Sequence, residues 1–120
     1  MSQSIDRGRK GEQLAREYLT AQGYLIEETN WRCRWGEIDI IALSPDGILV
    51  FVEVKSGYSR RFGHPCEWVT PKKAEKLIKS ARQYMLERNI CDVPVRFDVI
   101  AVDLRSGRII HITDAIKAEE

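Results

Sequence analysis

The stretch GEIDIIALSPDGILVFVEVK, residues 36–55, decides the fold of this 120-residue chain. Two nearly continuous apolar runs flank the sequence SPDG at residues 44–47, so the pattern predicts strand, turn, strand. Such runs are typical of interior strands that are covered on both faces. If the hairpin turns about Asp46, directly opposed residues have numbers that sum to 92. That register places Asp39 opposite Glu53 and Glu37 opposite Lys55.

The charged side chains of this hairpin would share one face. Opposed like charges on adjacent strands destabilise a sheet, so Asp39 against Glu53 needs a compensating charge. A hard divalent cation is the natural candidate. The competing interpretation is an ordinary ion pair between Glu37 and Lys55 on a solvated face, since 31% of the residues are charged. A slip of one residue would also move Glu53 away from Asp39.

Length and composition limit the class of protein. We expect a single domain over residues 1–120, large enough to bury a core without disulfide or metal staples. The sequence contains no apolar stretch of membrane-spanning length and begins without a signal-peptide core, so a soluble, cytoplasmic protein is expected. The 3 cysteines are odd in number and widely spaced, which favours free thiols.

The net charge of +1 conceals a basic region. Residues 55–82 carry 8 lysines and arginines against 2 glutamates, and a second basic group lies in residues 7–16. Basic surface beside an acidic site is typical of a metal-dependent enzyme that acts on a polyanion. The lysines of residues 72–79 fit the solvated face of a helix equally well.

Periodicity and turn residues predict the order of the secondary structure. Helices are expected over residues 5–22 and 71–89, the second with Thr70 as N-cap and Pro71 at its first position. Strands are expected over residues 24–34, 37–43, 48–56, 95–102 and 108–112. The order is therefore αβββαβ(β).

The first helix contributes one more carboxylate. At 100° per residue Glu12 lies within about 20° of Leu19, so it projects along the buried stripe of the helix. Gly8 and Gly11 would let the helix start approach another backbone. The competing interpretation of Glu12 is an i,i+4 ion pair with Arg16.

This arrangement resembles the restriction-endonuclease-like, PD-(D/E)xK nuclease superfamily, with an acid in the first helix, an aspartate on the second strand and E-x-K on the third. The runs GE at residues 11–12, NWR at 30–32, GEIDIIA at 36–42, FVEVK at 51–55 and RFDV at 96–99 are similar to small bacterial YraN-type proteins, relatives of archaeal Holliday-junction resolvases. The resemblance spans essentially the whole chain. It implies one restriction-endonuclease-like domain with a three-layer αβα fold, in which helices flank a central mixed sheet.

The resemblance also implies a catalytic site. Asp39, Glu53 and the backbone carbonyl of Val54 would bind Mg²⁺ or Mn²⁺, and Glu12 would bind a second ion or a water of the first. The bound ion would supply an activated water, which Lys55 would orient, or Lys55 would stabilise charge that develops on the phosphate. Glu37 would be a partner of Lys55.

Further residues are candidates for contact with nucleic acid. Basic side chains near tryptophans, in the loop after the third strand or near the start of the second helix suit phosphate contact, and those beside aromatic rings also suit base stacking: Arg32, Arg34, Arg60, Arg61 and Lys73. Packing and solvation explain them equally, and Trp31 and Trp35 fit a core role as well. The implied activity is metal-dependent endonucleolytic hydrolysis of DNA, including branched or junction DNA, and the resemblance allows a homodimer. A non-catalytic nucleic-acid-binding module and an interaction scaffold remain as alternatives.

Overall fold

A computed structural model describes residues 3–58 and 68–117. The elements in chain order are α1 (Gln3–Ala21), β1 (Leu25–Cys33), β2 (Gly36–Leu43), β3 (Leu49–Gly57), α2 (Pro71–Glu87), β4 (Val95–Asp103) and β5 (Ile109–Ile112). The predicted order is confirmed, and each predicted boundary lies within about two residues of the observed one. Neither helix in the described part of the chain combines the length and apolar character that a membrane crossing requires.

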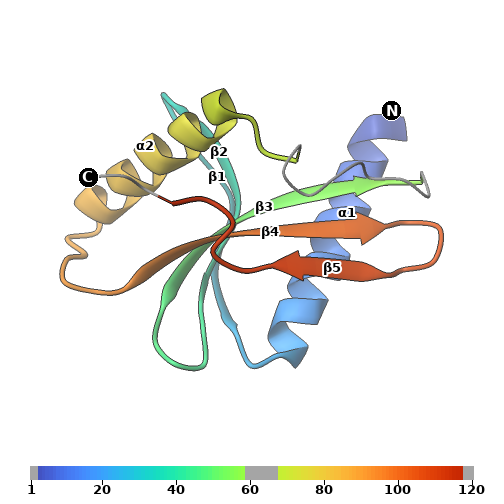
Figure 1. The fold of residues 1–120 in the computed structure, drawn as a ribbon, viewed down its shortest axis with the longest axis horizontal. Helices are drawn as coiled ribbons and strands as arrows, with labels where there is room; N and C mark the ends of the chain where they lie inside the picture. Colours follow the sequence, from blue (N-terminus) through green and yellow to red (C-terminus); the bar gives the residue numbers. More distant parts are fainter. Residues whose placement is uncertain (1–2, 59–67, 118–120) are drawn as a thin grey trace.

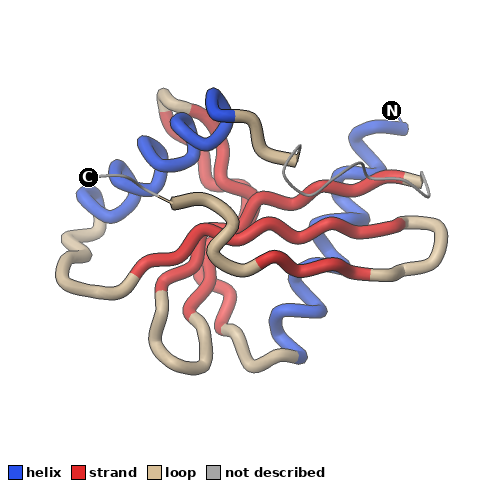
Figure 2. Tube along the Cα trace, in the orientation of Figure 1, coloured by secondary structure: helices blue, strands red, loops and turns tan. Residues whose placement is uncertain are grey.

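The five strands form one mixed sheet in the order β1-β2-β3-β4-β5. β3 and β4 run parallel and are joined through α2, whereas the other neighbouring pairs are antiparallel. Figure 1 shows α1 crossing behind β3, β4 and β5, and Figure 2 shows the strands splaying apart at both ends of the twisted sheet. The predicted mixed sheet is confirmed.

Each helix covers a different face of the sheet. On one face Ala15 and Leu19 of α1 pack against Val50 and Val52 of β3. On the other face the apolar side of α2 packs against a cluster that includes Phe51 of β3. Alternation along β3 therefore sends even-numbered side chains to α1 and odd-numbered ones to α2. The result is an α/β fold that is compatible with three layers.

The central hairpin has the predicted register. The paired residues run from Leu43 opposite Leu49 to Ile40 opposite Val52, so each pair sums to 92. Ile40 belongs to the core under α1, whereas Ile38 belongs to the core under α2, so the alternation of β2 breaks at the residue between them. That residue is Asp39, which lies one position beyond the last pair between β2 and β3.

Two local features help to position the helices. The Thr70 hydroxyl accepts a hydrogen bond from the Lys73 amide at 3.2 Å, which confirms the predicted N-cap and fixes the first turn of α2. A Cβ atom at Gly11 would lie 2.5 Å from the Ser56 side chain, so α1 approaches β3 as closely as glycine allows. The corresponding prediction for Gly8 was wrong, because a Cβ there would meet open space.

A buried ionic network connects α1 to the second half of the sheet. Asp98 is fully buried, and its two oxygens accept hydrogen bonds from Arg96 at 2.8 and 2.9 Å. His111 Nε2 lies 2.7 Å from the same carboxylate, and its Nδ1 lies 2.9 Å from the Tyr18 hydroxyl. Although burial alone would raise it, hydrogen bonds from His111 and Arg96 hold the pKa of Asp98 below its ordinary value. This network fixes α1 against β4 and β5.

Candidate functional site

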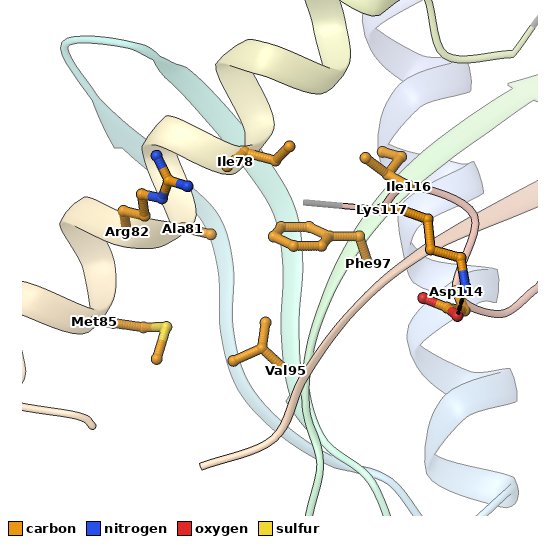
Figure 3. Close-up of a pocket in the computed structure, with 9 residues that line it drawn as sticks. All are labelled: Ile78, Ala81, Arg82, Met85, Val95, Phe97, Asp114, Ile116 and Lys117. Atoms are coloured by element: carbon orange, nitrogen blue, oxygen red, sulfur yellow. Dashed lines mark hydrogen bonds and ion pairs between the residues drawn. The ribbon is translucent and has the colours of Figure 1, made fainter. Parts of the chain in front are cut away.

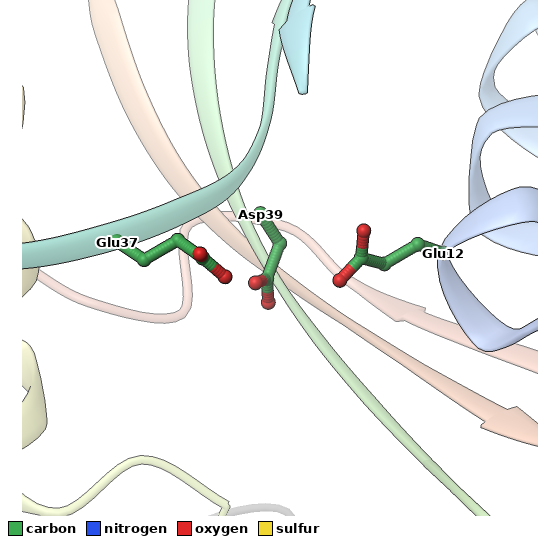
Figure 4. Close-up of side chains that lie close together, drawn as sticks. All are labelled: Glu12, Glu37 and Asp39. Carbon is green, nitrogen blue, oxygen red and sulfur yellow. The ribbon is translucent and has the colours of Figure 1, made fainter. Parts of the chain in front are cut away.

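Four carboxylates from three elements converge at the point where β2 and β3 separate. Carboxylate oxygens of Glu12 on α1 and of Glu37 and Asp39 on β2 lie within 4.8 Å of one another. Figure 4 shows Glu12 reaching from α1 toward Asp39, with Glu37 on the other side of Asp39. Glu53 of β3 lies beside Asp39, close enough for its negative charge to raise the pKa of Asp39. We call these four residues the carboxylate cluster.

Asp39 is held at the centre of the cluster by the backbone of β3. The Val54 amide donates a hydrogen bond to Asp39 Oδ2 at 2.7 Å. In a longer hairpin this amide would point to a β2 carbonyl, so the aspartate side chain replaces the missing backbone partner. The orientation of Asp39 is therefore set by the same break in the strands that creates the site.

The cluster retains a proton at neutral pH. Burial, and then the nearby Glu53 carboxylate, raise the pKa of Asp39 to about 8, against the opposing effect of the Val54 amide. Burial also raises the pKa of Glu53, although Lys73 acts in the opposite direction. Without a bound cation, Asp39 therefore holds its proton at neutral pH.

The chemistry of the cluster suits a hard divalent cation. Every donor is a carboxylate oxygen, and Mg²⁺ and Mn²⁺ prefer such ligands to nitrogen or sulfur. A cation among these groups would offset the charge repulsion that raises the pKa of Asp39. The donor set therefore fits the ion that the sequence predicted.

The predicted lysine and the predicted backbone ligand lie on β3 beside Glu53. Lys55 has its ammonium 6.0 Å from the ring centroid of Trp68, on the α2 side of the sheet. The Val54 amide donates a hydrogen bond to Asp39, and the Val54 carbonyl lies on the same part of β3. The Lys55 side chain and the Val54 carbonyl thus belong to residues that directly follow Glu53 in the chain.

Two cations contact the outer members of the cluster. Arg32 Nε lies 2.6 Å from Glu37, and Lys73 Nζ lies 3.9 Å from Glu53. The sequence predicted Lys55 as the partner of Glu37, but the ion pair found for this glutamate is with Arg32, its directly opposed residue on β1. Glu12, for its part, points toward the other carboxylates, as the interpretation of a site residue requires.

The aromatic residues near the site have separate roles. Trp31 packs edge-on against Tyr84 at 5.3 Å in the core under α2, so the core interpretation holds for it. Trp35, in the turn between β1 and β2, has the cations of Arg34 and Lys79 over its ring at 4.5 and 4.8 Å. The predicted contacts of Arg60 and Arg61 fall outside the described residues.

The sequence interpretation missed the network around Asp98. A signal was present, because this aspartate lies within an apolar run in an interior strand, where a carboxylate has to be paired. Its partner His111 comes from β5, which no short-range pattern connects to Asp98. The network supports α1, the helix that carries Glu12.

A separate pocket of about 380 Å³ lies between α2 and β4. Figure 3 shows the ring of Phe97 facing Ile78 across it, with the ion pair of Asp114 and Lys117 near one end. Its walls are mainly apolar: Ile78, Ala81, Arg82, Met85, Val95, Phe97, Asp114, Ile116 and Lys117. The carboxylate cluster therefore has a different location and a different chemistry.

Comparisons with known proteins point to one family. The model of the uncharacterised protein family UPF0102 matches residues 11–102, a range that includes the whole carboxylate cluster. A UPF0102 protein of Clostridioides difficile is 47% identical over 110 residues, which cover 92% of this chain and 96% of that protein. A UPF0102 protein of Persephonella marina is 46% identical over 109 residues, with 91% of each chain covered.

Among solved structures, Pyrococcus furiosus SfsA in complex with Ca²⁺ matches 96% of this chain at 19% identity, with a TM-score of 0.38. This chain covers 65% of the SfsA chain.

Proposed function

We propose that this chain, which belongs to the UPF0102 family, is a metal-dependent nuclease that hydrolyses DNA phosphodiester bonds, with branched or junction DNA as the substrate class. The convergence of four carboxylates at the break between β2 and β3 carries the proposal. The element order and the mixed sheet are compatible with the PD-(D/E)xK restriction-endonuclease-like fold, which we include in the proposal.

Asp39, Glu53, Glu12 and the Val54 carbonyl would hold Mg²⁺ or Mn²⁺. Such an ion, when bound, polarises a phosphoryl oxygen and acidifies a water molecule. Asp39 has to release its proton to become a full ligand, and the Val54 amide keeps its carboxylate in place as it does so. Ligand deprotonation makes metal affinity rise with pH up to about the pKa of Asp39, which is about 8.

The basic residues around the cluster would act on the nucleic acid. Lys55, two residues after Glu53 on β3, supplies a positive charge for the negative charge that develops on the phosphate in the transition state. Arg32 and Lys73 have exposed side chains beside Glu37 and Glu53, from which they would contact phosphates next to the cleaved bond. A homodimer would present two such sites to the two strands of a junction.

A nucleic-acid-binding module that does not cut is the second candidate. The raised pKa of Asp39 favours it, because a carboxyl group that keeps its proton at neutral pH binds metal weakly. The exposed cations would still hold a polyanion.

Cleavage of labelled DNA separates the two candidates. Duplex, flapped, single-stranded and four-way-junction substrates are incubated with Mg²⁺ or Mn²⁺ and the native chain, the Asp39→Asn variant or the Lys55→Ala variant. Asp46→Asn, in the exposed turn of the hairpin, is the matched control. A nuclease gives metal-dependent cutting that both site variants lose and the control retains. Binding of DNA by all four proteins without cutting would leave the binding module.

A further inference from the structure

Two exposed cationic side chains form ion pairs with Glu37 and Glu53 of the cluster. The Arg32 side chain is 80% exposed and contacts Glu37, and the Lys73 side chain is 61% exposed and contacts Glu53. Both glutamates are more buried than their partners, at 32% and 25% exposed. Each pair therefore joins a fixed carboxylate to a long side chain that is free to move into solvent.

The two cations come from different elements of the fold. Arg32 belongs to the edge strand β1, where it lies directly opposite Glu37. Lys73 belongs to the first turn of α2, where the Thr70 cap fixes its backbone and leaves the side chain to rotate. Neither position depends on the other, so each cation can leave its carboxylate alone.

The strength of these two ion pairs depends on whether a metal ion occupies the cluster. In the metal-free site the cluster is an excess of negative charge, which attracts Arg32 and Lys73 to its outer members. A divalent cation among the carboxylates neutralises part of that negative charge, which weakens its attraction for both side chains. Exposed pairs of this kind are worth about 1 kcal/mol or less, so a small loss of attraction is enough to release them.

We propose that Arg32 and Lys73 are exchangeable counter-ions, which neutralise Glu37 and Glu53 in the metal-free protein and move to nucleic-acid phosphates when a divalent cation binds. The inference rests on the proposed metal site and adds a regulation to it. Metal and nucleic acid then bind cooperatively, because each ligand relieves a cost of binding the other. Such coupling is reciprocal between the two ligands.

The first test measures Mn²⁺ binding by calorimetry without nucleic acid, at pH 8 and in 0.1 M salt. Lys73→Met and Arg32→Met each remove a cation that competes with the metal, so each should lower the Kd for Mn²⁺ roughly threefold to tenfold. Lys76→Met, an exposed lysine one turn along α2, is the matched control and should change it less than about twofold.

The second test measures the affinity for four-way-junction DNA in Ca²⁺ and in EDTA. Lys73→Met should weaken binding roughly threefold to tenfold in Ca²⁺ and less than about twofold in EDTA, where Lys73 is engaged by Glu53. Lys76→Met should have the same effect in both conditions, since its charge is not tied to the cluster.

The outcomes distinguish the two proposals. If the native chain binds Mn²⁺ and neither methionine variant binds it more tightly, the exchange of counter-ions is wrong and the metal site stands. If the native chain binds no Mn²⁺, the metal site fails and the exchange fails with it. Tighter metal binding by both variants, together with a metal-dependent loss of DNA affinity for Lys73→Met, establishes the exchange.

Discussion

Replacing Asp39 by asparagine should make the metal-free protein more stable at neutral pH. The native carboxyl is partly buried beside Glu53, and the pKa of Asp39 in the folded chain is about 8. Asparagine has the same shape and no charge, and its side-chain oxygen can still accept the hydrogen bond from the Val54 amide. The substitution thus removes the charge repulsion while it keeps the local geometry.

The magnitude follows from proton linkage. In the unfolded chain Asp39 loses its proton near pH 3.8, and in the folded chain it does so near pH 8. Between these values the folded chain binds the extra proton, so the stability of the native protein falls by about 1.4 kcal/mol per pH unit. Asp39→Asn has no carboxyl group at this position, so its stability does not fall with pH for this reason. Its advantage should be about 2 kcal/mol at pH 5 and about 4 kcal/mol at pH 7.

Urea unfolding followed by tryptophan fluorescence, in EDTA at pH 5, 6, 7 and 8, measures this advantage. Asp46→Asn, in the exposed turn, controls for the loss of one negative charge. The reasoning is refuted if Asp39→Asn is less stable than the native chain throughout, or if the difference between them does not change with pH.

Three further predictions concern the surroundings of the site. Asp98→Asn breaks a charged network at a fully buried position, leaves the half-buried Arg96 partly unpaired, and should cost about 3–5 kcal/mol in urea unfolding at pH 7. Because the pKa of Asp98 is lowered, the advantage of the native chain should fade as the pH drops through the acid range. A loss under about 1 kcal/mol at pH 7 would contradict a stabilising role of the Asp98 network. Gly11→Ala should destabilise the fold and weaken Mn²⁺ binding, because the added methyl group displaces α1 at Ser56. Gly8→Ala has room for the methyl group and should have neither effect. Equal effects of the two substitutions would refute the close approach of α1 to β3. Mg²⁺ at 100 times its Kd for the native chain should raise the free energy of unfolding of that chain by about 2.7 kcal/mol, as measured by thermal unfolding. The same Mg²⁺ concentration should stabilise Glu53→Gln much less. Equal stabilisation of both proteins would place the ion elsewhere.

The sequence predicted the part of the fold that depends on local patterns. The turn SPDG between two apolar runs determines the hairpin register, and Thr70 followed by Pro71 marks the start of α2. The proximity of Asp39 and Glu53 follows from that register. Strand periodicity and turn chemistry act over a few residues, so they can be recognised in one sequence.

The partners of the charged residues depend on contacts that no local pattern contains. Glu37 lies on an interior strand with a neighbour on each side, and the choice between Arg32 and Lys55 is made by the geometry of both hairpins. The pairing of Asp98 with His111 likewise requires β4 and β5 to be aligned in the sheet. The difference between Gly8 and Gly11 depends on where β3 ends, which the helix sequence does not contain.

The claim that the carboxylate cluster holds one divalent cation is tested most directly by anomalous diffraction from crystals of the native chain grown with Mn²⁺. The predicted result is a peak bounded by carboxylate oxygens of Asp39 and Glu53, which is lost in Asp39→Asn crystals grown identically. Mn²⁺ peaks at other places only, with none beside Asp39 and Glu53, would contradict the claim.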